Sequence, residues 1–422
     1  MREGSSVPIS LWDKSAAEPV FDNPSDIGGH CDVAVIGGGY TGLSTALHCA
    51  EKGLDCQVLE AKSIGYGGSG RNVGLVNAGL WLPPQDVRGR LGREKGTSLV
   101  QRLGDMPAYV FSLIEKHQIR CEAQRNGTIH AAHSPRGFEG LRGRAEEWQR
   151  LGAPVDLLDA DQTAEKTGTQ AFHGGLLDRR AGTINPMGYA RGLARAAHGA
   201  GAKVITGAAA EDLSRQGDRW AVKTSRGTLT AKKVVIATNA YTGGLWPGLR
   251  QTFTMIHFFQ IATEPLGDRA AHILKERQGL WDTAPVMFSL RRDDFGRLII
   301  GSMGADLGGL SRRWARANLK RLFPELDGVA FEESWHGQIA MTPDHLFRIH
   351  RLAEGLYTPV GYNGRGITTG TMFGQTLAEL FTGASEDSLP VPVTDLKPVS
   401  LNTLKTGFFH TAFAASQLIK SF

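Results

Sequence analysis

The 422-residue sequence predicts an α/β fold, in which a Rossmann-like βαβ domain, discontinuous in the chain, is joined to a second domain of mostly antiparallel strands. Three observations support this prediction. First, a buried strand near the N-terminus leads into a glycine-rich turn. Second, alternating helices and strands of the same kind occur again much later in the chain. Third, the segments between them contain strands joined by hairpin signals. A chain of this length has room for two or three domains with a sizeable core.

The first βαβ unit spans residues 31–62. Its apolar strand, Val33–Ile36, ends in the G-x-G-x-x-G sequence Gly37–Gly42, and Glu60 follows the next strand, Gln57–Leu59. In such a turn the first glycine permits the bend, the second lets a pyrophosphate approach the backbone, and the third lets helix pack on strand. The N–H groups at the helix start attract phosphate, and an acid about 20 residues further on accepts ribose hydroxyls. The pattern predicts a dinucleotide site; a glycine-rich turn in another α/β fold is the alternative.

Similar patterns return later in the chain. A helix is expected over Met187–Ala200, and a second glycine-rich turn, Gly361–Gly366, leads into a helix that ends at Phe381. Strands are expected over 203–206, 220–224, 227–230 and 234–237. We therefore assign to the nucleotide-binding domain the residues 28–78, 156–245 and 351–384.

The second domain is expected to comprise residues 79–155 and 246–350. Its clearest signal is the hairpin turn Asp293-Asp294-Phe295-Gly296 between two apolar strands. Other strands are expected over 128–132, 252–263 and 331–340, and helices over 91–119, 135–151 and 314–323. Residues 385–422 contain a proline-rich linker followed by a C-terminal helix that we expect to pack on the body of the protein.

Composition narrows the function classes. The net charge is +5 without a run of five like charges, so no nucleic-acid tail is expected. There is no signal-peptide pattern and no apolar stretch of about 18 residues, so a cytoplasmic protein without a spanning segment is expected. His130 and His133 lack further ligands at zinc spacing, and no metal is expected. No C-x-x-C pair occurs, so buried free thiols are predicted for Cys31, Cys49, Cys56 and Cys121.

Four motifs in this order resemble a known family. They are Gly37-x-Gly39-x-x-Gly42, Ser69-Gly70-Arg71-Asn72, Val235-Ile236-Ala237-Thr238-Asn239-Ala240-Tyr241 and Gly361-Tyr362-Asn363-Gly364-Arg365-Gly366. The chain resembles the FAD-dependent D-amino-acid oxidase superfamily in its glycine/sarcosine oxidase-like branch. The resemblance is greatest to γ-glutamylputrescine oxidoreductases and L-pipecolate oxidases, which also open with a segment like Ser10-Leu11-Trp12. Those relatives usually read Arg-Asn-Gly-Gly-Gln where this chain has Arg71-Asn72-Val73-Gly74-Leu75.

The resemblance implies FAD as the cofactor. Relatives attach flavin through a late cysteine or through a histidine after the first glycine turn; this chain has no cysteine after Cys121 and no histidine in 65–79, so non-covalent FAD is expected. Its expected contacts are Gly37, Gly39, Tyr40, Thr41, Gly42, Glu60, Ala61, Ser69, Gly70, Arg71, Asn72, Ala210, Asn239, Gly364, Arg365, Gly366 and Thr368.

The substrate side is expected on the second domain's sheet, which roofs the flavin in the resembling family. In the strand Met255–Ile261 alternate residues share a face, so His257 and Phe259 point the same way. Core packing is the alternative for any one of these aromatic residues. The substrate-binding candidates are Arg71, His257, Phe259, His336 and Asn363, and the catalytic candidates are His257, His336 and Arg365.

The resemblance implies an FAD-dependent amine or amino-acid oxidase or dehydrogenase. Its substrate would be an amine or secondary amino acid, γ-glutamylputrescine-like or pipecolate-like, that gives a hydride to flavin N5 and leaves an imine that hydrolyses. Dioxygen or another acceptor would take the electrons. Two alternatives stay open: a 2-hydroxy-acid oxidase or dehydrogenase on the same fold, which would need a base, and a flavoprotein acting on modified tRNA.

Overall fold

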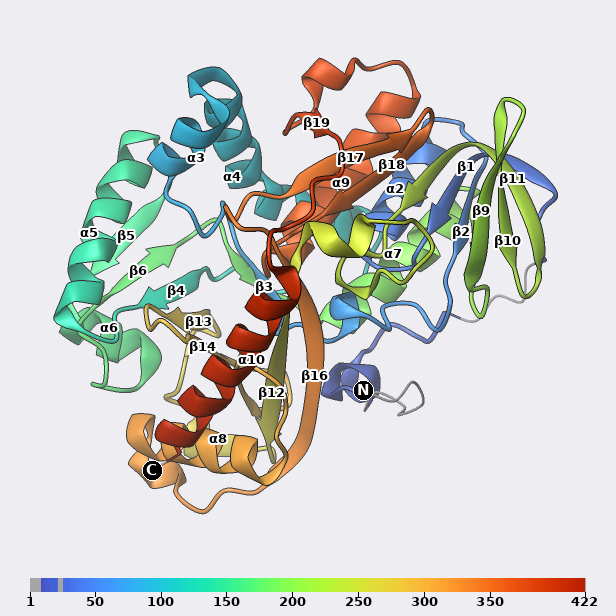
Figure 1. The fold of residues 1–422 in the computed structure, drawn as a ribbon. Helices are drawn as coiled ribbons and strands as arrows, with labels where there is room; N and C mark the ends of the chain where they lie inside the picture. Colours follow the sequence, from blue (N-terminus) through green and yellow to red (C-terminus); the bar gives the residue numbers. More distant parts are fainter. Residues whose placement is uncertain (1–8, 22–25, 422) are drawn as a thin grey trace.

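Two large sheets, one next to the other, organise the molecule in a computed structural model that describes residues 9–21 and 26–421 (Figure 1). The nine-stranded first sheet contains β1 (His30–Ile36), β2 (Cys56–Leu59), β8 (Lys203–Ile205), β9 (Ala210–Gln216), β10 (Arg219–Thr224), β11 (Gly227–Ile236), β17 (Arg348–Ala353), β18 (Leu356–Val360) and β19 (Val393–Thr394). The eight-stranded second sheet contains β4 (Thr128–Ala131), β5 (Val155–Leu158), β6 (Gly175–Asp178), β12 (Thr254–Thr263), β13 (Gly279–Asp282), β14 (Phe288–Arg292), β15 (Leu298–Met303) and β16 (Phe331–Met341). A small third sheet pairs β3 (Leu75–Val76) with β7 (Gly182–Thr183).

The centre of the first sheet is parallel. Strands β18, β11, β1, β2 and β8 run side by side in the same direction, as βαβ connections require. Strand β10 pairs antiparallel with the first half of β11, and β9 pairs antiparallel with β10. Because parallel strands end at the same sheet edge, the residues after β1, β2 and β11 lie together there.

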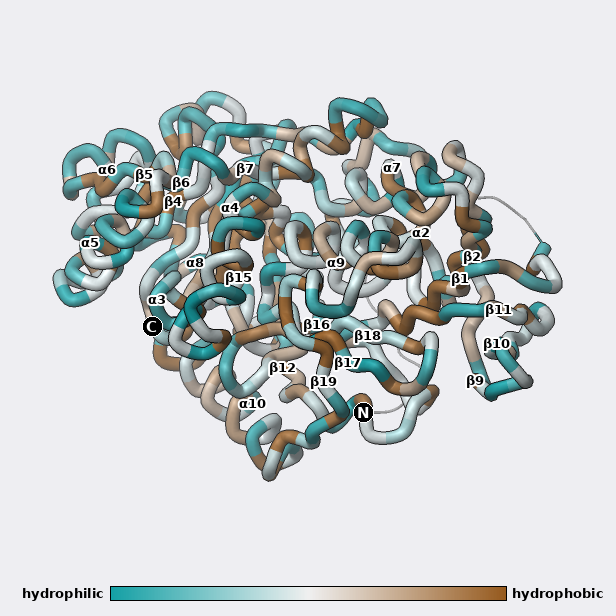
Figure 2. Tube along the Cα trace, turned by 90° about the horizontal axis from the view of Figure 1, so that it is seen from above, coloured by the Kyte–Doolittle hydropathy of each residue, from teal (hydrophilic) through white to brown (hydrophobic). Residues whose placement is uncertain are grey.

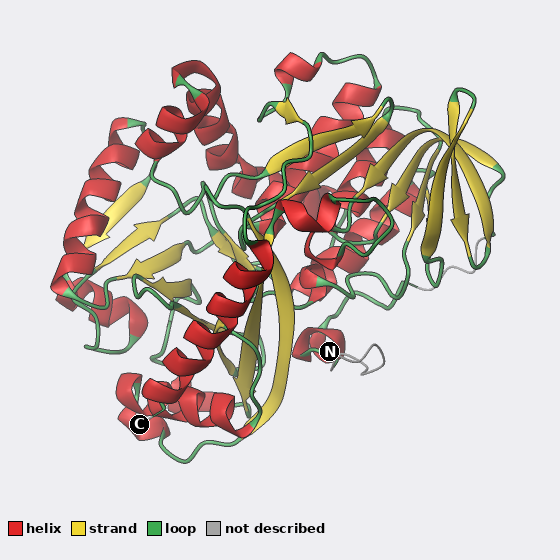
Figure 3. Ribbon diagram, in the orientation of Figure 1, coloured by secondary structure: helices red, strands yellow, loops and turns green. Residues whose placement is uncertain are grey.

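The second sheet is antiparallel except for the pair β4–β13. Its edge strand β16 is long and curved and lies nearest to the first sheet (Figure 3). All ten residues of its neighbour β12 are buried. One face of β12 packs against α8, through Phe259 and Trp314.

Ten helices surround the sheets in the described part of the chain: α1 (Leu11–Ser15), α2 (Tyr40–Glu51), α3 (Pro84–Leu91), α4 (Arg93–Lys116), α5 (Pro135–Arg150), α6 (Ala160–Thr167), α7 (Pro186–Gly199), α8 (Gly309–Leu322), α9 (Gly366–Phe381) and α10 (Asn402–Ile419). The largest core joins α2, α4, α7 and α9 to one face of the first sheet. In Figure 2 the strands β1 and β2 are hydrophobic, whereas the peripheral helices α5 and α6 are largely hydrophilic. No described helix is both long and apolar enough to traverse a lipid bilayer.

Glycines allow the helices α2 and α9 to pack closely on their neighbours. A Cβ at Gly42 would lie only 1.9 Å from the Gly37 carbonyl oxygen, so the third glycine of the turn is sterically required. On α9, Gly370 and Gly374 face α2; a Cβ at Gly374 would lie 2.3 Å from Ser44 Cβ. The two helices therefore pack backbone to backbone.

The α/β fold class is confirmed, as are the four buried free cysteines. Two elements differ from expectation. Helix α8 begins at Gly309, before the predicted start at Trp314. The two predicted strands over 227–230 and 234–237 form the single strand β11, because its first half pairs with β10 and its second half with β1 and β18.

The domain boundaries stay a prediction. Most strands of each sheet lie in the segments predicted for it. Strands β5 and β6, however, pair in the second sheet although residues 156–245 were assigned to the first domain. Strand β19, within 385–422, pairs with β17 in the first sheet, and α10 packs across β12 and α8.

Substitution of Gly374 tests the helix contact. Gly374→Ala should lower the free energy of unfolding by about 2 kcal/mol or more, because the new methyl group overlaps the backbone of α2. The matched control is Gly89→Ala in α3, an exposed helical glycine with no described atom within 4 Å of the position that a Cβ would take. Gly89→Ala should raise the free energy of unfolding by about 0.5–1 kcal/mol. Urea unfolding followed by circular dichroism measures both; equal effects would contradict this account of the packing.

Candidate active site

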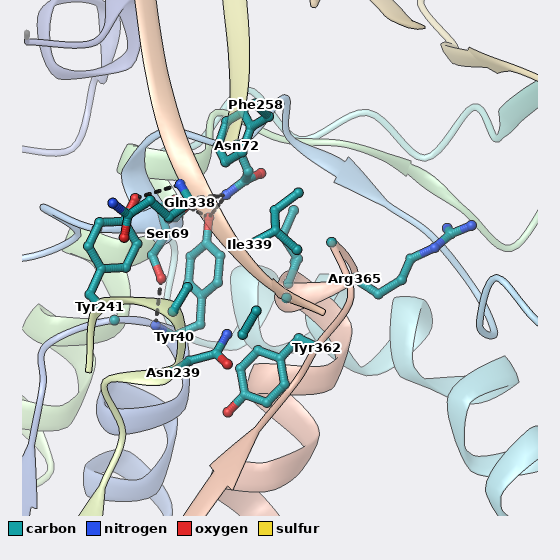
Figure 4. Close-up of a pocket in the computed structure, with 18 of the residues that line it drawn as sticks. Tyr40, Ser69, Asn72, Asn239, Tyr241, Phe258, Gln338, Ile339, Tyr362 and Arg365 are labelled. Atoms are coloured by element: carbon teal, nitrogen blue, oxygen red, sulfur yellow. Dashed lines mark hydrogen bonds between the residues drawn. The ribbon is translucent and has the colours of Figure 1, made fainter. Parts of the chain in front are cut away.

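A cavity of about 460 Å³ lies where the carboxyl ends of the parallel strands meet the second sheet. It is lined by the turn after β1, by residues after β2 and β11, by the inner face of β12 and β16, and by the turn before α9 (Figure 4). These segments are far apart in the sequence. The cavity therefore exists only in the folded chain.

Glu60 marks one end of the cavity. Its carboxylate accepts the Gly38 N–H at 2.6 Å and the Lys62 N–H at 2.8 Å. Burial raises the pKa of Glu60, while the backbone N–H groups of Gly38, Lys62 and Ala61 act in the opposite direction. A carboxylate held in this way can accept further hydroxyl donors from a ligand.

The turn and the loop after β2 form the next part of the wall. The N-terminus of α2 begins at Gly39 without a side-chain cap, and the Tyr40 N–H donates to Ser69 Oγ at 3.0 Å. Asn72 donates through Nδ2 to the Ser69 carbonyl at 3.0 Å and accepts the Gly74 N–H at 2.8 Å. These bonds hold the glycine-rich loop against the helix start.

The middle of the cavity lies between the sheets. Tyr241 Oη accepts the Gln338 N–H at 3.1 Å and so ties the segment after β11 to β16. Asn239, at φ +42°, accepts the Gly361 N–H at 3.0 Å and ties the same segment to the turn before α9. Asn363 accepts the Thr342 N–H at 2.8 Å.

The far end carries a buried cation. The Arg365 side chain points away from the cluster around Tyr40 and Asn72 (Figure 4). Its guanidinium carbon lies 4.6 Å from the Trp81 ring centroid and 4.8 Å from that of Trp281. Within the described part of the chain, neither Nε nor Nη1 of Arg365 has a hydrogen-bond partner. Burial, together with the positive charge of Arg144, lowers the pKa of Arg365 to about 9.

Aromatic stacking fixes this cation in place. Trp81 and Trp281 meet edge to face, and His130 stacks on Trp281 with ring centroids 3.4 Å apart. Trp81 Nε1 donates to the Asn363 carbonyl, and Arg144 donates to the carbonyl oxygens of Leu80 and Trp81. The guanidinium therefore lies against two tryptophan rings, while two of its nitrogens have no acceptor in the described chain.

The cavity fits an elongated dinucleotide. A Cβ at Gly38 or Gly39 would crowd the wall, since it would lie 2.9 Å from Ile64 Cδ1 or 2.9 Å from Ser69 Oγ, respectively. The wall thus combines a carboxylate, a helix N-terminus with glycine at its N-cap and apolar strand residues, the groups that ribose, pyrophosphate and a planar ring require. No cysteine or histidine is found among the described residues that line it.

Most predicted cofactor contacts reach this cavity. The predicted contacts that line it are Gly37, Gly39, Tyr40, Thr41, Glu60, Ala61, Ser69, Asn72, Ala210, Asn239, Gly364, Arg365 and Gly366. The predicted contacts that do not line it are Gly42, Gly70, Arg71 and Thr368. Arg71 instead donates from Nε to the Tyr66 carbonyl at 2.7 Å, beside the wall.

Most of the predicted substrate residues lie outside this cavity. Of these, only Asn363 lines the cavity. His257 and Phe259 do share a face of β12, but that face points away: His257 contacts His410 on α10 at 3.1 Å, and Phe259 packs on Trp314. His336, paired with Phe259 across the sheet, lies outside the cavity wall as well. Phe258 and Gln260, on the opposite face of β12, line the cavity instead.

Several wall residues were missed. Tyr241 ended a quoted motif, so its position was available from the sequence. Trp81 and Trp281 had no local signal, because they are 200 positions apart and meet only through the packing of β13 beside the loop before α3. Gln338 and Ile339 lie on β16, whose cavity-facing residues cannot be chosen from alternation alone.

Comparisons with known proteins agree with this geometry. A family model described as FAD dependent oxidoreductase (DAO) matches residues 32–380. Gamma-glutamylputrescine oxidoreductase from Escherichia coli (strain K12) is 33% identical over 367 residues, which is 84% of each chain. The crystal structure of glycine oxidase from Geobacillus kaustophilus superposes with a TM-score of 0.71 at 22% identity, over 87% of this chain and 99% of that one.

A further solved structure shows the same fold. L-amino acid deaminase from Proteus vulgaris, with its specific insertion sequence deleted, superposes with a TM-score of 0.72 at 17% identity, over 91% of this chain and 96% of that one. The resemblance deduced from the four motifs is thereby confirmed, and the cofactor is FAD. The chain belongs to the DAO family of FAD-dependent oxidoreductases and is an amine or amino-acid oxidoreductase of that family.

Proposed function

We propose that the protein oxidises the C–N bond of an amine or secondary amino acid that also carries a carboxylate, as γ-glutamylputrescine and pipecolate do. The observation that carries this proposal is the buried guanidinium of Arg365, which has two unpartnered nitrogens within the described chain and lines the same cavity as Glu60. The substrates in the names of several relatives also combine an amine with a carboxylate: γ-glutamylputrescine, 4-methylaminobutanoate, sarcosine and glycine.

Arg365 is suited to a carboxylate for physical reasons. An isolated buried charge is unfavourable, and a guanidinium edge matches two carboxylate oxygens through parallel N–H···O bonds. The two tryptophan rings that lie against the guanidinium restrict its position. A bound carboxylate would supply the hydrogen-bond acceptors that Arg365 Nε and Nη1 lack in the described chain.

The proposed cofactor contacts follow the wall. Glu60 would accept ribose hydroxyls, the N–H groups at the start of α2 would face the pyrophosphate, and Gly364 and Gly366 would lie close to the ring. Bound FAD supplies the two-electron acceptor for the C–H bond next to the substrate nitrogen. Ala61, Ala210 and Asn239 would complete the site. The absence of cysteine and histidine from the described wall supports non-covalent binding.

The ionisable residues of the cavity wall indicate whether a catalytic base is available to the substrate. They are Glu60, Lys62, Arg365 and four tyrosines, and burial raises the pKa of Tyr241 to about 12. Burial also raises the pKa of Tyr40 and Tyr362, so these three tyrosines stay protonated at neutral pH and none of the three serves as a base. An amine that binds unprotonated needs no base, whereas a 2-hydroxy acid does. This arrangement supports amine oxidation over the 2-hydroxy-acid alternative.

Anaerobic reduction of the purified holoprotein tests the reaction class. Amines with a carboxylate should bleach the flavin absorbance, while amines without one and 2-hydroxy acids should do so far more slowly. Hydrogen peroxide release and dye reduction on reoxidation then distinguish dioxygen from another acceptor. Bleaching by 2-hydroxy acids alone would overturn the proposal.

Glu60→Ala tests the ribose contact. The FAD dissociation constant should rise by about 10- to 100-fold, since a hydrogen bond to a charged group contributes about 1.5–3 kcal/mol. Asp32→Ala is a matched control, because Asp32 accepts a backbone N–H on the same sheet without lining the cavity. Fluorescence titration of apoprotein with FAD measures both; an unchanged constant for Glu60→Ala would place the ribose elsewhere.

Arg365→Met tests the carboxylate contact. The variant should raise KM for carboxylate-bearing amines by about 100-fold or more, since a charged hydrogen-bonding pair is lost. It should also raise the melting temperature of the apoprotein, because a buried unpartnered charge is replaced by an apolar chain.

The control for this substitution is Arg292→Met. Arg292 donates to the Ala270 carbonyl at 2.6 Å outside the cavity, so its loss should lower stability and leave KM unchanged. A KM for Arg365→Met equal to that of the unaltered enzyme would show that another group binds the carboxylate.

A further inference from the structure

The loop after β2 lines the cavity on one side, and four side chains donate hydrogen bonds to its other side. The backbone carbonyls of four consecutive residues, 70–73, each accept a hydrogen bond from outside the loop. The donors, in order, are Ser10 Oγ at 2.9 Å, Trp335 Nε1 at 2.8 Å, Trp12 Nε1 at 2.9 Å and Arg291 Nη1 at 3.3 Å. The donors come from the N-terminal segment, from β16 and from β14.

These donors form one buried cluster. Ser10, Trp12, Trp335 and Arg291 are each at most 1% exposed. Trp12 meets Trp335 edge to face with ring centroids 5.8 Å apart, and the Arg291 guanidinium lies over the Trp12 ring at 5.1 Å. Trp12 therefore both donates to the loop and supports two of the other donors.

The N-terminal segment is itself firmly attached. Ser10 and Asp13 form a capping box at the start of α1, and Ser10 Oγ, 2.8 Å from Asp13 Oδ2, shares its proton between that carboxylate and the loop. Asp13 pairs with Arg191 at 3.4 Å on α7. Glu18, almost fully buried, pairs with Arg195 and accepts the Arg120 N–H at 3.0 Å.

The inner side of the same loop faces the cavity. Ser69, Asn72 and Val73 line it, and the loop contains glycines that give it little conformational preference of its own. A loop that is ordered before its ligand arrives binds that ligand more tightly, since less entropy is lost on binding. The outer hydrogen bonds are therefore placed to preorganise the cavity wall.

We propose that the N-terminal segment positions the FAD-binding loop, with Trp12 as the principal positioning residue and Ser10 as a second. This inference rests on the proposed contact of Ser69 and Asn72 with FAD. Neither Trp12 nor Ser10 lines the cavity, so each acts through the loop backbone.

The test is FAD binding to the apoprotein of the full chain. Trp12→Phe removes the N–H donor but keeps an aromatic ring, and Ser10→Ala is the milder variant should Trp12→Phe fold poorly. The FAD dissociation constant should rise at least fivefold for Trp12→Phe and about twofold to threefold for Ser10→Ala. Ser10→Thr, which keeps the hydroxyl, should restore the value of the unaltered protein.

The matched control is Trp314→Phe. Trp314 is equally buried, in the core of the second sheet, and packs on Phe259. It should lower the melting temperature of the apoprotein as Trp12→Phe does, without changing FAD affinity. Visible circular dichroism of bound flavin is a second readout, expected to change for Trp12→Phe alone.

The outcomes separate the two proposals. If the unaltered protein binds FAD, Glu60→Ala weakens binding, and Trp12→Phe and Ser10→Ala bind as tightly as the unaltered protein, the positioning role is wrong and the cofactor site stands. If the unaltered apoprotein does not bind FAD, the cofactor site is wrong and the positioning role falls with it. An equal loss of affinity in Trp314→Phe would show a general effect of stability and would also overturn the inference.

Discussion

The structure depends on one close backbone approach, between Gly42 of α2 and the carbonyl of Gly37. There is no space for a side chain at this point, since a Cβ would lie 1.9 Å from that oxygen. The approach lets α2 lie directly on β1, and α9 then packs on α2 through Gly370 and Gly374. The N-terminus of α2 and the turn before α9 consequently open into the same cavity.

The second sheet supplies one side of the cavity wall but does not form the cavity alone. Strand β12 is buried on both faces, with the helices α8 and α10 against one face and the cavity at the other. Strand β16 contributes Gln338 and Ile339 to the wall and is tied to the first sheet by the hydrogen bond of Tyr241. Contacts between the sheets are therefore part of the site.

Several polar side chains along the wall are hydrogen-bonded within the protein, whereas Gln260 Oε1 has no partner in the described chain. Glu60, Ser69, Asn72 and Asn363 all accept or donate hydrogen bonds within the protein. Arg365 differs, because its Nε and Nη1 have no partner in the described chain while two tryptophan rings hold the group in place. A protein that keeps such a charge unpaired loses stability there, and a ligand that supplies the acceptors recovers it.

The fold class, the family and the cofactor could be predicted without the structure, because each rests on local order: a buried strand, glycines at fixed spacing and an acid after the next strand. The sequence also predicted that His257 and Phe259 share a face of their strand. Which of the two faces meets the cavity depends on how the whole chain packs, since both faces of β12 are buried and alternation cannot distinguish them. The tryptophan pair around Arg365 was equally hidden, because residues 200 positions apart meet only when the two sheets pack.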